Sequence, residues 1–147
     1  MGPKKKDEKR EDDEMVEESG SFVFEEVQGT YQGAIQRKGA EVKRNGSGAY
    51  QDTNVAYEGG WKDDQLHGTG KLRFLASNSA YDGGFYEGKF DGTGTFKWAT
   101  GAVYVGQWRA NRMHGDGVYT DCDGTVWHGK FYNGTGPGLR PKWAATV

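Results

Sequence analysis

The sequence predicts an all-β protein: a single-layer antiparallel meander of β-hairpins that is elongated and twisted. Three observations lead to this prediction. Aromatic residues recur at positions 31, 57, 81, 104 and 127, in steps of 26, 24, 23 and 23 residues, and a fixed period in this range is typical of repeat architectures. Each copy alternates aromatic residues and glycines with the period of two that a β-strand has. Helix signals are absent after residue 20.

The repeat unit is clearest between Tyr104 and Gly117. It reads Tyr-Val-Gly-Gln-Trp and, six residues later, Gly-Asp-Gly, with a histidine just before the first of these glycines. The same skeleton occurs at 57–70 and 81–94, and looser copies lie at 31–48 and 127–136. About five repeats of two strands each predict roughly ten short strands in one sheet.

The two faces of the predicted sheet differ in chemistry. The period of two puts Tyr104, Gly106 and Trp108 on one face, so that this face is aromatic and glycine while the other is mostly polar. Glycine weakens a strand unless a neighbouring group needs its space, and an aromatic ring laid over the glycine of the next strand fills that space. Turns are expected at dipeptides that tolerate positive φ: Asn45-Gly46, Asp91-Gly92, Asp123-Gly124 and Asn133-Gly134.

A charged segment precedes the repeats. Residues 1–20 hold five basic and eight acidic groups, which predicts a disordered charged tail, with a helix on a bound partner as the alternative. Residues 21–147 form the repeat domain, whose first and last repeats are degenerate. The apolar Phe22-Val23-Phe24 either starts a strand or caps the sheet edge.

Composition excludes several classes of protein. The net charge is −2 and basic residues are not clustered, so no nucleic-acid partner is expected. A single cysteine, Cys122, excludes an internal disulfide framework and fits a reducing compartment. No apolar run approaches the about 20 residues of a membrane span, and the N-terminus has no signal-peptide core. We therefore expect a soluble, cytoplasmic protein.

The residues that could carry chemistry do not form a site. His67 and His114 occupy equal positions in successive repeats, where they lie apart, and His128 follows Trp127. General acid–base or metal chemistry needs groups that converge on one point. Cys122 has no basic neighbour in the sequence that would lower its pKa, and Gly-Thr-Gly has no Walker lysine or Rossmann context. We expect no catalytic residue, cofactor or metal.

The aromatic face is the candidate interaction site. Two interpretations remain open: tight twisting lets the rings cover one another, or the rings line a concave groove for a partner's helix or extended segment. The second interpretation predicts eight partner-binding residues: Tyr57, Trp61, Tyr81, Phe85, Tyr104, Trp108, Trp127 and Phe131.

The repeat skeleton resembles the MORN repeat, whose unit is Tyr-x-Gly-x-Trp followed by His-Gly-x-Gly over about 23 residues. The resemblance covers roughly residues 30–138, and the segment from Pro137 to Lys142 is similar to the end of short members of the family. It implies a non-catalytic scaffold that holds protein partners, often in cilia, flagella and other cytoskeletal structures. Some members of the family are linked to membranes and phosphoinositides.

Two functions follow as expectations. The first is a structural component of a cilium or flagellum axoneme, part of a larger assembly, that docks a protein partner on the repeat sheet. The alternative is a peripheral membrane adaptor that binds anionic lipids in vesicle or phagosome traffic. Acidic residues on the polar face dilute the basic ones, so that membrane attraction of about 1 kcal/mol per basic residue would be largely cancelled. The basic residues are Lys71, Arg73, Lys97, Arg109 and Arg112, and the acidic ones are Asp63, Asp64, Asp82 and Asp91.

Overall fold

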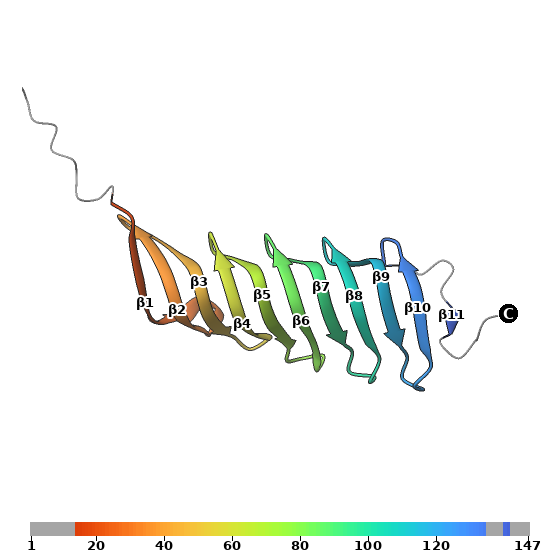
Figure 1. Cartoon of the computed structure of the whole chain (residues 1–147). Coiled ribbons are helices and arrows are strands. Elements are labelled where there is room, and N and C mark those ends of the chain that lie inside the picture. Colours follow the sequence, from red (N-terminus) through yellow and green to blue (C-terminus); the bar gives the residue numbers. More distant parts are fainter. Residues whose placement is uncertain (1–13, 135–139, 142–147) are drawn as a thin grey trace, which may run out of the picture.

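All strands belong to one antiparallel sheet in which sequence order and spatial order coincide (Figure 1). The computed structural model describes residues 14–134 and 140–141. The strands are β1 (Val16–Phe24), β2 (Gly29–Lys38), β3 (Glu41–Gln51), β4 (Val55–Lys62), β5 (Gln65–Phe74), β6 (Ser79–Tyr86), β7 (Lys89–Lys97), β8 (Val103–Arg109), β9 (Arg112–Thr120), β10 (Val126–Phe131) and β11 (Arg140–Pro141), with one 3-10 turn, η2 (Glu25–Val27). The predicted single-layer meander is confirmed.

The hairpins of the first four repeats close through two-residue turns. The turn between β4 and β5 has φ values of 47° at Asp63 and 68° at Asp64, and the turn between β8 and β9 has 46° at Ala110 and 70° at Asn111. Positive φ at both central residues is the geometry that matches the twist of antiparallel strands. The turn also reaches back one repeat, since the Asp64 N–H donates to the Arg44 carbonyl at 3.0 Å.

Two of the four predicted turns are wrong. Asn45-Gly46 lies inside β3 and Asp91-Gly92 lies inside β7, whereas Asp123-Gly124 and Asn133-Gly134 do fall in turns. The glycines at the first two places have positive φ, 103° at Gly46 and 79° at Gly92. They lie at an irregularity within a strand that requires positive φ, which glycine adopts there as readily as it does in a turn.

This irregularity is a bulge in the second strand of each hairpin. Gly59 pairs with Gly70 while Trp61 pairs with Leu66, so that β5 inserts extra residues opposite Gly60. Gly68, with φ of 80°, lies at the bulge. A Cβ on Gly60 would collide with the His67 carbonyl oxygen. The bulge therefore explains the pair of glycines in β4 and in β6 and the Gly-x-Gly of the second strands.

The N-terminal boundary differs from the expected one. Strand β1 starts at Val16 and pairs with β2 over nine consecutive residues, so that residues 16–20, assigned to the tail from the sequence, belong to the sheet. Backbone pairing with β2 stabilises this segment, although its mixed charge hides the strand pattern in the sequence. The Arg37 guanidinium of β2 also forms an ion pair with the Glu18 carboxylate at 3.4 Å. Residues 1–13, most of the remaining predicted tail, lie outside the described residues, as do 135–139 and 142–147.

Candidate functional site

The aromatic face is the core of the protein. Of the eight predicted partner-binding residues, seven are buried, from Tyr104 at 0% exposed to Trp108 at 7%, and only Trp127 is partly exposed. The rings cover one another edge to face; the ring centroids of Tyr57 and Phe85, for example, lie 5.2 Å apart at 84°. The structure thus favours the first interpretation of this face, because the expected groove of exposed rings is not formed.

Each repeat tyrosine covers a glycine of the next strand. The Tyr57 hydroxyl donates to the Gly60 carbonyl at 2.9 Å, which holds the ring over Gly70 so closely that a Cβ there would overlap it. Tyr104 does the same with the Gln107 carbonyl, at 2.8 Å, and with Gly117. The aromatic–glycine ladder expected from the sequence is therefore present, with a hydrogen bond that fixes the ring.

Each repeat tryptophan ties its repeat to the preceding one. The Trp61 indole N–H donates to the Gly48 carbonyl, and the Trp108 indole N–H donates to the Gly94 carbonyl, both at 3.1 Å. The acceptor is in each case the last glycine of the preceding Gly-x-Gly. Each of these tryptophans therefore contributes both a buried ring and a hydrogen bond that joins two repeats.

The sequence pattern did not reveal a row of core residues that lie opposite the second large aromatic residue of each first strand. Leu66, Phe90 and Met113 each pair with the large aromatic residue of the first strand and pack against the buried cluster. The bulge shifts the strand register, so that counting by two from Gly-x-Gly does not find them. Their spacing of 24 and 23 residues was the signal that could have done so.

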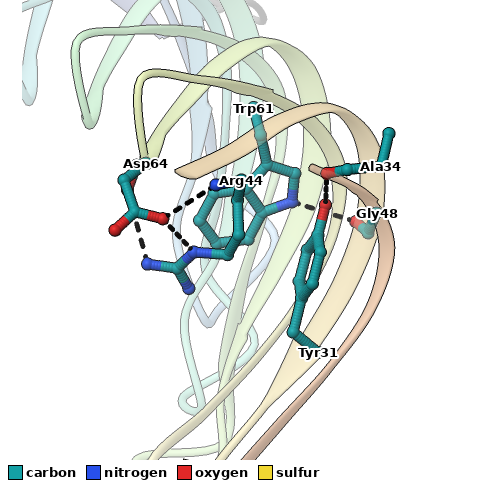
Figure 2. Close-up of polar contacts among 6 residues, drawn as sticks. All are labelled: Tyr31, Ala34, Arg44, Gly48, Trp61 and Asp64. Atoms are coloured by element: carbon teal, nitrogen blue, oxygen red, sulfur yellow. Dashed lines mark hydrogen bonds and ion pairs between the residues drawn. The ribbon is translucent and has the colours of Figure 1, made fainter. Parts of the chain in front are cut away.

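At the N-terminal end an arginine takes the place of this apolar row. Arg44 pairs with Ile35 as Leu66 pairs with Trp61, and its guanidinium lies 4.1 Å from the Trp61 ring centroid, a cation–π contact. Asp64 accepts from its Nε at 2.7 Å and from its backbone N–H at 3.1 Å. Figure 2 shows the guanidinium between the Asp64 carboxylate and the indole. The charge on the aromatic face is thus paired within the sheet.

The opposite face, here called the polar face, carries a groove that crosses the strands. It holds about 980 Å³ and is lined by residues of β1 to β7. One wall includes Arg73 and Lys97, with Ala80 between them in the strand register. The other includes Lys71, flanked by Glu58 and Asp82 in the adjacent strands. We call this the transverse groove; one of its walls is basic and the other is of mixed charge.

The basic side chains of the transverse groove are available to a ligand. Arg73, Lys97 and Lys71 make none of the four ion pairs found among residues 14–134. Ala56 and Ala80 stand in the same row as Arg73 and Lys97, and their small side chains leave room between the two walls. A groove with unpaired cations on one wall can accept an acidic, extended ligand.

The histidines and the cysteine form no reactive pair in the described structure. His67 lies 5.3 Å from the Tyr86 ring and His114 lies 5.6 Å from the Tyr132 ring, centroid to centroid. Cys122 is exposed in the turn between β9 and β10, whose Gly124 N–H donates to the Asp121 carbonyl. Within residues 14–134 and 140–141 no cluster of three metal-ligating side chains is found. No helix in this part of the chain is long and apolar enough to cross a membrane.

Burial changes the titration of the repeat tyrosines. Desolvation raises the pKa of Tyr57 and of Tyr104 to about 12, although the backbone hydrogen bonds that their hydroxyls make lower it. Burial also raises the pKa of Tyr81, and the nearby carboxylates of Asp91 and Asp82 add to this effect.

These shifts predict alkaline unfolding. An unfolded tyrosine loses its proton near pH 10, whereas the folded protein holds it up to a pH of about 12. Between these values the folded state binds more protons than the unfolded state, so that the free energy of unfolding falls as pH rises. Urea denaturation at pH 9 to 12 should give constant stability up to about pH 10 and a steep fall above it. A flat profile up to pH 12 would contradict the burial of the three hydroxyls.

The fold defines a repeat protein whose core is a ladder of rings and glycines and whose free surface is the opposite face of one sheet. The MORN repeat model matches residues 57–74, 81–103 and 104–126. The chain therefore contains MORN repeats, a repeat motif that is non-enzymatic and generally serves protein or membrane interactions. No curated protein matches the chain.

The first repeat has the same geometry although the repeat model does not match it. The Tyr31 hydroxyl donates to the Ala34 carbonyl at 2.7 Å, and its ring lies over Gly48, as in the matched repeats. The resemblance of residues 137–142 to short members of the family stays a prediction, since most of this segment lies outside the described residues.

Proposed function

We propose that the protein is a non-catalytic scaffold that docks an extended segment of a protein partner in the transverse groove, as a structural component of a cilium or flagellum axoneme. The observation that supports docking is the groove itself, which crosses seven strands on the face that the core leaves free. The assignment to an axoneme rests on the family resemblance alone.

The groove dimensions suit an extended segment. Strands lie about 4.8 Å apart, so that six spacings span about 29 Å, the length of about nine extended residues at 3.3 Å each. On the aromatic face, seven of the eight residues predicted to bind a partner are buried and so are not available to one. This moves the proposed site from the aromatic face to the polar face.

The basic wall sets the chemistry of the partner. Arg73 and Lys97 flank Ala80 without an acidic residue between them, and neither has an ion pair among the described residues. A partner segment with carboxylates on one side would pair with them. Truncating one partner of a buried charge pair costs about 2 to 5 kcal/mol, so these two residues are the sharpest probes of the groove.

The test compares two charge-reversal variants of equal net charge. Arg73→Glu/Lys97→Glu changes the groove, whereas Lys62→Glu/Lys89→Glu changes two exposed lysines that do not line it. A protein captured from axonemal extract by the wild type should be lost with the first variant and kept with the second. We expect the affinity of the groove variant to fall at least about tenfold, equivalent to 1.4 kcal/mol.

The membrane alternative is tested with the same variants. Sedimentation with vesicles that contain an anionic lipid such as phosphatidylserine should show little binding by the wild type, because Glu58 and Asp82 oppose Lys71 across the groove. Strong vesicle binding that both charge-reversal variants abolish, without capture of a protein, would contradict the scaffold proposal and favour a peripheral membrane adaptor.

A further inference from the structure

The first strand of the sheet is an unusually open edge. Strand β1 is the terminal strand of the meander, and it pairs with β2 through nine consecutive residues without a bulge. Its outer backbone groups have no partner strand among the described residues. Proteins commonly protect such an edge with proline, charged side chains or a bulge. Strand β1 has no proline, lysine or bulge, and its two charged residues, Glu17 and Glu18, both stand in its first half.

Apolar side chains are concentrated at this edge. Val16 is 46%, Phe24 39% and Val23 71% exposed. Val16 and Phe24 stand at the two ends of the strand on the same side of the sheet as the core, since both are an even number of residues from Phe22, which packs against the core. In an antiparallel pair of two such strands, the apolar residue at the start of one strand lies opposite the apolar residue at the end of the other.

Strand β1 is such a partner for itself. Antiparallel pairing of two copies centred on Gly20 aligns all nine residues and joins the two aromatic faces on one side of the combined sheet, because paired residues then share a face. Val16 of one copy lies opposite Phe24 of the other. Glu17 lies opposite Val23, and Glu18 lies opposite Phe22, so that no carboxylate faces another across the two-fold axis.

The centre of the strand leaves room for this arrangement. Gly20 would lie opposite Gly20 of the second copy, and the Phe22 ring already leans over it, 3.6 Å from where a Cβ would stand. The two phenyl rings would thus flank a pair of glycines, the same ring-over-glycine packing that holds successive repeats together. Glu18 is meanwhile compensated by Arg37 of its own copy.

From these observations we infer that the protein associates with a second copy of itself through antiparallel pairing of β1 in the Gly20-centred register, which makes one continuous sheet across a two-fold axis. This interface is isologous, as most homodimer interfaces are. It does not depend on the proposed function, because it uses the backbone edge of β1 rather than the transverse groove.

Sedimentation equilibrium of the full chain tests the association. The expected mass at high protein concentration is twice the single-chain 16.2 kDa. Gly20→Lys should return it to the single-chain value, since it places two lysines opposite each other, whereas Val118→Lys, at an exposed valine of β9, should leave the dimer intact. Circular dichroism verifies that both variants keep the sheet. A single-chain mass at all concentrations overturns the inference.

Cysteine cross-linking tests the register, in a Cys122→Ser background that removes the exposed native thiol. Paired residues in an antiparallel sheet have Cα atoms about 4.5 to 5.5 Å apart, within the 4.4 to 6.8 Å that a disulfide spans. Gly20→Cys should form a disulfide dimer on its own. Val16→Cys and Phe24→Cys should cross-link only when mixed. Self-linking of Val16→Cys, or equal linking of a Val118→Cys control, overturns the register and points to another mode of contact.

Discussion

Replacing Trp108 by alanine is expected to cost about 3 to 5 kcal/mol of folding free energy, the range for removing a large buried aromatic side chain. The indole is 7% exposed, packs against Tyr104 at 5.1 Å and Tyr81 at 5.4 Å between ring centroids, and donates to the Gly94 carbonyl. Its loss opens a cavity at the junction between two repeats. Urea denaturation monitored by far-UV circular dichroism measures the change.

Two companion variants separate the causes. Trp108→Phe keeps most of the ring volume and removes the indole donor, so that its smaller cost reports the hydrogen bond to Gly94 and the residual cavity. Val118→Ala, on the polar face and 40% exposed, should change stability by no more than about 0.5 kcal/mol. If Trp108→Ala were as mild as Val118→Ala, the aromatic face would not be the core.

Adding a single methyl group at Gly117 is expected to destabilise the protein by about 1 to 3 kcal/mol, the usual cost of overpacking. A Cβ at this position would overlap the Tyr104 ring and its hydroxyl. Thermal or urea unfolding of Gly117→Ala measures the effect. Gly20→Ala, measured at a protein concentration low enough for the chain to be a single copy, is the matched control, since its Cβ would meet Phe22 at an ordinary 3.6 Å.

A double-mutant cycle identifies the tyrosine as the cause. In a Tyr104→Ala background the ring is absent, so that Gly117→Ala should cost much less than it does in the wild type. Contacting residues typically show coupling energies of about 0.5 to 3 kcal/mol. An unchanged cost of Gly117→Ala in that background would mean that the glycine is needed for its backbone rather than for the space above it.

The sequence was sufficient for the architecture because the strand period and the repeat period agree. Tyr104, Gly106 and Trp108 alternate as a strand requires, and the same order recurs often enough to leave one topology, a meander. The resemblance to the repeat family was carried by these residues and is supported by the repeat matches. Side-chain type and spacing alone therefore predicted the single layer, the order of the strands and the aromatic–glycine character of one face.

The local geometry and the surface could not be predicted in the same way. Gly92 is compatible with a turn and with a bulge, because both need positive φ, and only the register of β6 against β7, which shifts between Gly83 and Phe85, decides between them. Burial depends on how far the sheet twists, which determines whether rings such as Trp61 and Phe85 cover one another. A strand at Phe22 was one of the two expectations for this segment, but the first part of β1, residues 16–20, was missed because its Glu17-Glu18 pair reads as a charged tail until β2 is present to pair with it.

The direction of the strands determines how this protein bears tension. Strands β1 and β11 lie at opposite ends of the meander, so that a pull applied between them acts across the strands and loads the backbone hydrogen bonds of one strand pair at a time. The sheet would then open like a zipper from whichever end is weaker, instead of shearing as a whole. Each released repeat of about 23 residues adds roughly 75 to 80 Å of extended chain. A partner bound across several strands would hold neighbouring strands together and so make the sheet resist this stepwise separation.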